Sequence, residues 1–375
     1  LSATILRLNQ NILHKKGYSY YDMKQSNHSY WIYDHSGPAH SKIKCFSSLV
    51  KEGGKLRMLV FSTNFDFEDV LEKRDPDEFS WNKKFSEEEV SSYSMKRVVE
   101  SSKNVYSGKF LLFETEFQNT YVLVTHVKRK NFRLGIKRFL EQFYPYLSYP
   151  LMTSYELRSI LDIISKNTDN ELISEKLVAY ESNKNKNREA DVKYTKNENY
   201  LQSFNNVLKS DMYIDKWNVK SVGKDREAIF DGFISRRGIL KCKSGFNNFY
   251  RLIVNKVSKK ASDQNSNFSN RENTKGETSN PITIKYSRPV FKNTNNNHEL
   301  VKAINEIENM SCSVYHANPY LHISLVDFKD GSSFDIWVDT NDKITIVPQV
   351  RGNPASISRL LNNIYEKFEE GAVVS

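Results

Sequence analysis

Cysteine is scarce in this sequence: three occur in 375 residues, far apart at Cys45, Cys242 and Cys312. An odd, scattered set gives neither a disulfide framework nor the paired spacing of a zinc finger, so we expect buried thiols in a reducing compartment. No apolar run approaches the roughly 18 residues that a membrane span needs. The N-terminal stretch is too polar for a signal peptide. We therefore expect a cytoplasmic protein that has no membrane partner.

Several common catalytic signatures are also missing. The sequence has no phosphate-binding loop, no dinucleotide fingerprint and no Gly-x-Ser-x-Gly elbow, which leaves kinase, reductase and elbow-type hydrolase functions without support. It shows no carboxylate cluster with the spacing of a metal site. We therefore expect neither a cofactor nor a bound metal.

Basic residues exceed acidic ones by 55 to 45, which gives a net charge of +10 and a pI near 9.1. This balance favours a polyanionic partner, and nucleic acid, either DNA or RNA, is the natural one. The composition is 38% hydrophobic and 27% charged, which is typical of a globular protein. At roughly 150 residues per domain, the length predicts two domains.

A polar stretch over residues 182–198 predicts the linker between these domains. The predicted fold class is α/β and α+β, with an α/β domain over 1–181 and an α+β domain over 199–375. Periodicity, capping boxes and turn residues define the elements. Helices are expected at 2–14, 86–102, 136–144, 153–164, 199–209, 298–309 and 354–371. Strands are expected at 29–34, 40–46, 56–62, 110–116, 120–126, 236–243, 248–256, 312–316, 320–326, 333–338 and 343–347. Residues 258–280 are expected to form a mobile polar insertion.

One short stretch carries a chemical signature. His40 and Lys42 are two apart on a predicted strand, so both point to one face. The next predicted strand ends in Ser-Thr-Asn64, and if the two strands pair, Asn64 reaches the same face. An imidazole, an ammonium and an amide would then converge, a set that suits a phosphate: the imidazole attacks phosphorus and the other two stabilise the charge on its oxygens.

Residues 30–66 resemble the phospholipase D superfamily, in its tyrosyl-DNA phosphodiesterase-like branch, with a His-x-Lys strand followed by a strand that ends in Ser-Thr-Asn. Ser47 stands where the wider superfamily has aspartate, which fits only the branch that lacks it. The resemblance implies a phospholipase D-like α/β fold for residues 1–181. It also implies a metal-independent phosphodiesterase with His40 as nucleophile, a phosphohistidine intermediate, and Lys42 and Asn64 on the phosphate.

That mechanism requires a second histidine as general acid. His126-Val-Lys128 repeats the His-x-Lys pattern, and His322-Ile-Ser324 lies on a predicted strand. A homodimer that pairs two His40 sites is the other alternative. The source of the second half-site therefore stays open.

Two further basic segments predict contacts with nucleic acid. One joins a strand to a helix and the other forms a β-hairpin. The candidate contacts are Arg129, Lys130, Arg133, Lys137, Arg138, Arg236, Arg237, Lys241 and Lys243. Asp231 precedes this hairpin as an aspartate does in magnesium nucleases, but Lys241 stands where that site needs a carboxylate. The stretch from Tyr315 to Ser324 is interpreted as a tight turn between core strands.

The favoured function is a nuclease, and microbial restriction or antiviral defence is its natural setting by association only. The alternative is a non-catalytic nucleic-acid-binding subunit of a larger complex, in which His40 and Lys42 only contact phosphate.

Overall fold

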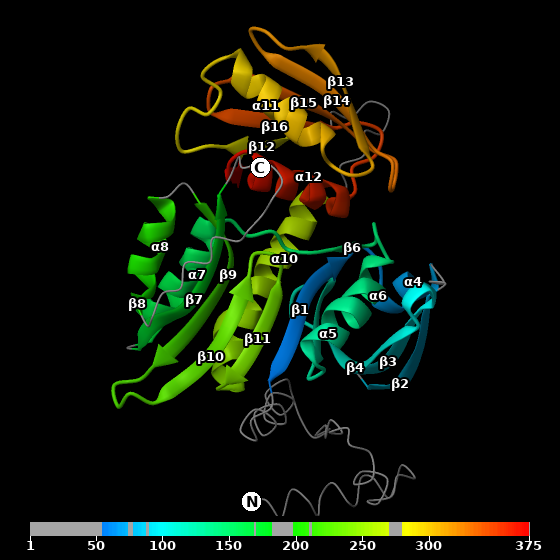
Figure 1. Ribbon diagram of the computed structural model, residues 1–375, viewed down its shortest axis with the longest axis vertical. Coiled ribbons are helices and arrows are strands. Elements are labelled where there is room, and N and C mark those ends of the chain that lie inside the picture. The colour runs from blue at the N-terminus through cyan, green and yellow to red at the C-terminus, as the bar shows by residue number, and fades with distance from the viewer. Residues whose placement is uncertain are drawn as a thin grey trace, which may run out of the picture.

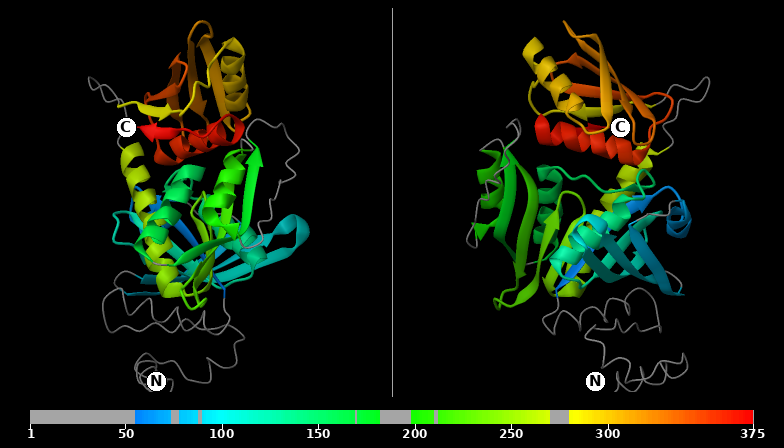
Figure 2. Two further views of the ribbon diagram at one scale, coloured as in Figure 1. Left: turned by 90° about the vertical axis from the view of Figure 1, so that its left-hand side faces the viewer. Right: turned by 45° about the vertical axis from the view of Figure 1, so that its right-hand side comes forward.

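The computed structural model describes residues 55–73, 78–87, 90–168, 170–181, 198–209, 212–269 and 280–374. These residues form two β-sheets, of eleven and six strands. Figure 1 shows the larger sheet below and the smaller one above, with helix α12 (Pro354–Lys367) lying between them. The turned views in Figure 2 place α12 in the same position.

The larger sheet has the strand order β2-β3-β4-β5-β1-β11-β10-β9-β7-β8, and β6 pairs with β1. Its strands are β1 (Leu56–Thr63), β2 (Phe79–Glu87), β3 (Val90–Val99), β4 (Asn104–Glu114), β5 (Thr120–Thr125), β6 (Leu147–Ser148), β7 (Glu171–Glu181), β8 (Glu198–Asn199), β9 (Met212–Val222), β10 (Ala228–Ser235) and β11 (Ile239–Ser244). Short turns join β2 to β3, β3 to β4, β4 to β5, β9 to β10 and β10 to β11, so these neighbours run antiparallel.

Helices cover opposite faces of this sheet at its two ends. Its helices are α4 (Phe67–Glu72), η1 (Glu100–Ser102), α5 (Arg129–Asn131), η2 (Phe132–Ile136), α6 (Lys137–Glu141), α7 (Ser154–Asn167), α8 (Tyr200–Leu208), and α9, η3 and α10, which follow one another over Phe246–Phe249, Tyr250–Val254 and Asn255–Phe268. On β1, Leu59 and Phe61 pack into a core with η2 and α6. Met58 and Val60, which point the other way, share a core with α7, α8 and α10. On the face of β10 and β11 opposite α7, Lys241 and Lys243 alternate with the buried Leu240 and Cys242, and Phe233 lies opposite Lys241.

The smaller sheet has the order β13-β14-β15-β16-β12-β17. Its strands are β12 (Ile282–Lys285), β13 (Met310–His316), β14 (Leu321–Asp327), β15 (Ser332–Thr340), β16 (Lys343–Pro348) and β17 (Ala372–Val374). Helix α11 (Thr294–Asn305) and α12 pack on one face, where their leucines and isoleucines meet those of the strands. Alternate residues of β14 and β15 are buried there, the pattern of a sheet that is covered on one side.

The predicted fold class is wrong. Every strand pair between described residues is antiparallel, so the parallel α/β core of a phospholipase D-like domain is not present in them. A parallel pair needs a crossover of a dozen or more residues. The chain instead links its strands through hairpins, of which β4–β5 is one.

Several predicted elements are confirmed. The hairpin over 110–126 forms β4 and β5, the capping box of Thr153 and Glu156 starts α7, and the four strands between 312 and 347 form β13–β16. The predicted helix over 86–102 is wrong, because most of its described residues lie in β2 and β3 and only Glu100–Ser102 is helical. Tyr93 and Met95, two apart, are buried in the core beneath α6, a period that only a strand satisfies.

The predictions for 248–256 and 258–280 are also wrong over their described parts, since a continuous helix runs from α9 through α10. Its buried face includes Gln264 and Asn265, whose amides bond the backbone. Gln264 Nε2 donates to Leu151 O at 2.6 Å, and Asn265 Nδ2 donates to Thr63 O at 3.2 Å. Because polar side chains occupy part of the buried stripe, the hydrophobic pattern of this helix is weak.

Within the predicted linker, residues 182–197 lie outside the described residues, and the strands on either side of it, β7 and β9, pair in the larger sheet. The predicted elements at 2–14, 29–34 and 40–46 also lie outside the described residues. Among the residues that are described, no helix combines the length and the apolar character that crossing a membrane requires.

Candidate nucleic-acid interface

Two basic side chains face each other in the middle of the larger sheet. Arg57 on β1 is directly opposite Lys241 on β11, and both are half-buried. Like charges placed directly opposite each other across two strands destabilise a sheet. Burial lowers the pKa of Lys241, and the charges of Arg57, Lys55 and Lys243 lower it further. Burial and the charge of Arg129 lower the pKa of Arg57.

The strand alternation explains how this cluster is held. Leu56 and Met58 on β1 are fully buried against α7 and α10, so Arg57 between them points to the other face. There its Nε donates to Val127 O at 3.1 Å. Arg129 follows two residues later as the first residue of α5 and is exposed. We call Lys55, Arg57, Arg129 and Lys241 the basic cluster.

Lys243, two residues along β11, is in contrast neutralised. Its Nζ lies 2.7 Å from Glu175 and 2.8 Å from Asp231. Burial disfavours its charge, but the hydrogen bonds that its ammonium donates to these carboxylates prevail and raise the pKa of the lysine. Asp231 is thus engaged by an ammonium group, and no group of three or more metal-binding side chains is assembled anywhere in the described part of the chain.

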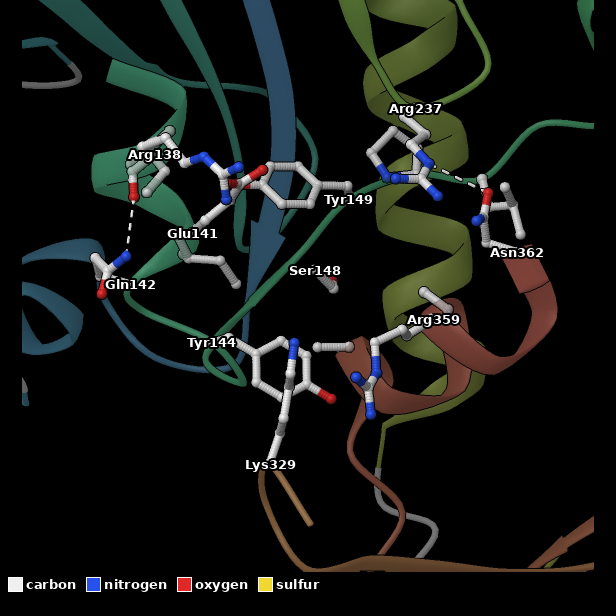
Figure 3. A pocket seen from close by; sticks show the side chains of 16 residues that line it. Arg138, Glu141, Gln142, Tyr144, Ser148, Tyr149, Arg237, Lys329, Arg359 and Asn362 are labelled. Carbon is white, nitrogen blue, oxygen red and sulfur yellow. Dashed lines mark hydrogen bonds and ion pairs between the residues drawn. The ribbon is translucent and has the colours of Figure 1, made fainter. Parts of the chain in front are cut away.

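A cleft of about 460 Å³ lies where the two sheets meet. Figure 3 shows its walls: α6 and the segment after it on one side, the turn before β11, and α12 with the β14–β15 turn on the other. Four basic residues line it, namely Arg138, Arg237, Lys329 and Arg359. Glu141 is the one acidic residue among the lining residues. The cleft is therefore predominantly basic.

Three of these cations have carboxylate partners. Arg138 pairs with Glu141 at 3.1 Å, Arg237 with Glu366 at 3.3 Å, and Arg359 with Asp327 at 2.5 Å. The first two cations are about half-exposed, so these pairs are weak and readily exchanged for a phosphate. No ion pair of Lys329 with a carboxylate is recorded among the described residues.

Tyr144 fixes the floor of the cleft. Its hydroxyl donates to Asp327 Oδ2 at 2.9 Å and lies 2.6 Å from Ser356 Oγ. Lys329 Nζ and the Arg359 guanidinium lie 5.8 and 5.7 Å from its ring centre, within the range of cation–π attraction. Burial and the nearby Asp330 and Asp327 raise the pKa of Tyr144. The tyrosine therefore stays neutral and orients two cations from the smaller sheet's side.

The predicted catalytic trio is described only in part, since His40 and Lys42 lie outside the described residues. Asn64 is exposed just after β1, and its Oδ1 accepts a hydrogen bond from Ser269 Oγ at 3.2 Å. The two edges of β1 are paired, one with β5 and the other with β11 and β6. The predicted pairing of β1 with a strand at 40–46, which would bring Asn64 to His40 and Lys42, therefore gains no support. The catalytic role of these three residues stays a prediction.

The alternative half-site residues lie in different sheets. His126 is half-buried just after β5, and Lys128 caps the start of α5 and is exposed. His322 lies on β14 of the smaller sheet and stacks on Trp337 with ring centres 3.5 Å apart.

The predicted phosphate contacts divide into surface and core. Arg129, Lys130 and Arg133 are exposed along α5 and η2. Lys137 is paired with Glu141 at 3.1 Å. Arg236, in contrast, is fully buried and pairs with Glu370 at 3.1 Å, so it is not available to a ligand on the surface.

Sequence reasoning missed Lys55, Arg57, Lys329 and Arg359. The alternation Lys55-Leu-Arg57-Met on a predicted strand was a usable signal, because it places both cations on one face. Lys329 and Arg359 carried no such signal, since only the packing of the two sheets brings them to the cleft. The chain matches no protein-family model and no curated protein sequence.

Proposed function

We propose that this chain binds nucleic acid through the phosphate backbone, as a non-catalytic binding subunit. The observation that carries the proposal is the Arg57–Lys241 pair, two cations held directly opposite each other with lowered pKa values. Such a pair costs folding stability. A bound phosphate between them would remove the repulsion and release condensed counterions from the polymer.

The extent of the basic surface favours a polymer over a single nucleotide. Arg237, in the turn just before β11, lines the cleft, and Lys241 lies four residues further along the same segment. The cleft and the basic cluster therefore each receive a cation from one short segment, β11 and the turn before it. Exposed Arg129, Lys130 and Arg133 extend the surface along α5 and η2.

Lys241→Gln tests the proposal, because it separates binding from stability. The substitution removes one member of a repelling pair, so the fold is expected to be retained while affinity for nucleic acid falls. Titration of a labelled 20-nucleotide duplex and single strand, followed by anisotropy across salt concentrations, should show weaker binding and a salt slope smaller by about one. Lys166→Gln is the matched control, since Lys166 is exposed on α7 on the opposite face.

Two results would overturn this function. One is a wild-type chain that binds neither ligand at low salt. The other is equal affinity losses in Lys241→Gln and Lys166→Gln, which would reduce the effect to net charge.

The phosphodiesterase activity stays a prediction that the same material tests. Wild-type protein incubated with these ligands in EDTA should cleave them if His40 is the nucleophile, and His40→Ala should abolish cleavage while sparing binding. If the ligands stay intact in every sample, only the binding role remains.

A further inference from the structure

The smaller sheet presents a second surface, on the face turned away from α11 and α12. On β14, Leu321 and Ile323 are fully buried toward the helices. His322 lies between them and therefore points to the opposite face. Trp337 on β15 is directly opposite His322, so two neighbouring strands place rings side by side there.

Five rings continue this contact into a row, which we call the aromatic ladder. It runs Tyr315, His322, Trp337, Tyr320 and His316. Successive ring centres lie 5.1, 3.5, 6.2 and 4.1 Å apart. The His322 and Trp337 rings are nearly parallel, at 11°. Tyr315 is 66% exposed and Tyr320 41%, which is unusual for large aromatic side chains, whose area is normally buried.

The polar groups of the ladder are incompletely satisfied. Nε2 of His316 and Nε2 of His322 are buried atoms for which the described residues supply no hydrogen-bond partner. The nearest carboxylate oxygen to His322, from Asp335, is 3.7 Å away, beyond hydrogen-bond distance. Buried polar atoms usually have partners. Their lack here indicates a surface that is completed by a ligand with its own donors and acceptors.

Cations lie on the same face beside the rings. Lys343 follows the alternation of β16 from Thr345, which is opposite Trp337. Lys285 on β12 is directly opposite Lys343. The pair repeats, on the smaller sheet, the arrangement of Arg57 and Lys241. Asp335 and Asp339 also lie near this face, and Asp339 is 3.5 Å from Lys343. The ladder itself is therefore close to neutral, with cations at its edge.

We propose that the aromatic ladder binds the unpaired bases of single-stranded nucleic acid, with Tyr315 and Tyr320 as stacking platforms and Lys285 and Lys343 on the adjoining phosphates. The proposal rests on the proposed function and names its substrate class. Exposed rings offer flat apolar surface to a base, whereas a duplex keeps the faces of its bases stacked inside. A near-neutral centre with a cationic edge matches a single strand, whose bases and backbone are separated in the same way.

Three ligands of equal length distinguish stacking from phosphate contact. They are a labelled 20-nucleotide oligothymidine, the same strand made with abasic sites, and a duplex. If the ladder stacks bases, the wild type binds oligothymidine most tightly. Removal of the bases then weakens binding although every phosphate remains.

Tyr315→Ala is expected to weaken oligothymidine binding by about 5- to 150-fold, the range for loss of one base stack. Binding of the abasic strand and of the duplex should not change. Tyr315→Phe should restore affinity, because the ring alone carries the stack. Tyr155→Ala is the matched control, since this tyrosine is also exposed, at 56%, but lies on α7 of the larger sheet.

The outcomes separate the two proposals. If no ligand binds, the proposed function fails. If all ligands bind and Tyr315→Ala changes none of them, phosphate binding stands and the ladder proposal is overturned. A third outcome would also overturn the ladder proposal. In it, the wild type is retained on a polysaccharide resin, Tyr315→Ala loses this retention, and oligothymidine binding is unchanged. The rings would then bind sugar.

Discussion

The two sheets leave different kinds of surface uncovered. On the larger sheet the open face carries Arg57 and Lys241 directly opposite each other, and their repulsion works against folding. On the smaller sheet the open face carries the aromatic ladder, in which His322 stacks on Trp337, and such contacts stabilise the sheet that displays them. The like charges of the first surface therefore cost folding stability when no ligand is bound, whereas the stacked rings of the second stabilise their own sheet.

This difference shows how one chain can recognise the phosphates of a nucleic acid with one sheet and its bases with the other. Charge binds any polyanion and responds strongly to salt. Rings respond to the presence of free bases and far less to salt. Phosphate binding by one sheet and base stacking by the other can act on the same ligand only if the two sheets keep their relative position. The contacts between the sheets are therefore tested first.

The largest expected effect is at this junction. Arg236 Nη2 lies 3.1 Å from Glu370 Oε1, and Glu370 Oε2 accepts a hydrogen bond from Ser154 N at 2.9 Å. Arg236→Ala would leave the buried Glu370 carboxylate without its cation and is expected to lower the free energy of unfolding by about 3–5 kcal/mol. Urea unfolding followed by circular dichroism measures it.

Its control is the neighbouring Arg237→Ala, which removes a half-exposed ion pair with Glu366 and should cost less than about 1 kcal/mol. The deficit of Arg236→Ala should also shrink in acid. Burial raises the pKa of Glu370 although Arg236 opposes it. Below that raised pKa Glu370 is protonated, so its buried negative charge is no longer present. Equal losses in the two variants, or a deficit that grows on acidification, would contradict this account of the junction.

A smaller effect is expected from Tyr144→Phe, which deletes the hydroxyl that reaches Asp327 and Ser356 across the junction. Asp327 keeps its contact with Arg359, so the expected loss is about 1–2 kcal/mol. The ring and its two neighbouring cations remain, and nucleic-acid affinity should therefore stay within about twofold. A tenfold loss of affinity would show that the cleft depends on the hydroxyl itself.

Elements with strong local signals could be predicted from the sequence. The capping box of Thr153 and Glu156 and the Pro354 that begins α12 act within one turn of helix, so no distant residue is needed to recognise them. Helix α10 could not be recognised, because Gln264 and Asn265 are buried only where they find backbone partners in other segments. The fold class failed for the same reason: strand partners are chosen by tertiary packing.

The candidate sites divide in the same way. Arg129 and Lys241 could be predicted because each lies in a run of basic residues that the sequence itself shows. Their combination with Arg57 could not be found, because it depends on the register of β1 against β11. From the sequence, the stretch from Tyr315 to Ser324 is interpreted as a turn; the aromatic ladder could not be recognised, because its rings come from three strands and the connecting segment.

The smallest expected effect concerns Lys241→Gln and its dependence on pH. The folded-state pKa of Lys241 is lowered, first by burial and then by Arg57, so at pH 7 its charge destabilises the fold. Replacement should therefore raise the free energy of unfolding by about 0.5 kcal/mol at pH 7. As the pH rises through the lowered pKa toward the ordinary value of 10.5, the wild-type lysine loses its proton and the penalty with it. The advantage of the variant should then disappear.

Urea unfolding at pH 7 and at pH 10.5 measures this change. Lys243→Gln is the opposite control on the same strand, because Asp231 and Glu175 raise the pKa of Lys243. Its charge stabilises the fold at pH 7 and stops doing so only as the pH rises through that raised value. The two variants should therefore have effects of opposite sign at neutral pH. If both were destabilising to the same degree, the charge of Lys241 would have to be compensated in the free protein, and the contrast between the two open faces would be lost.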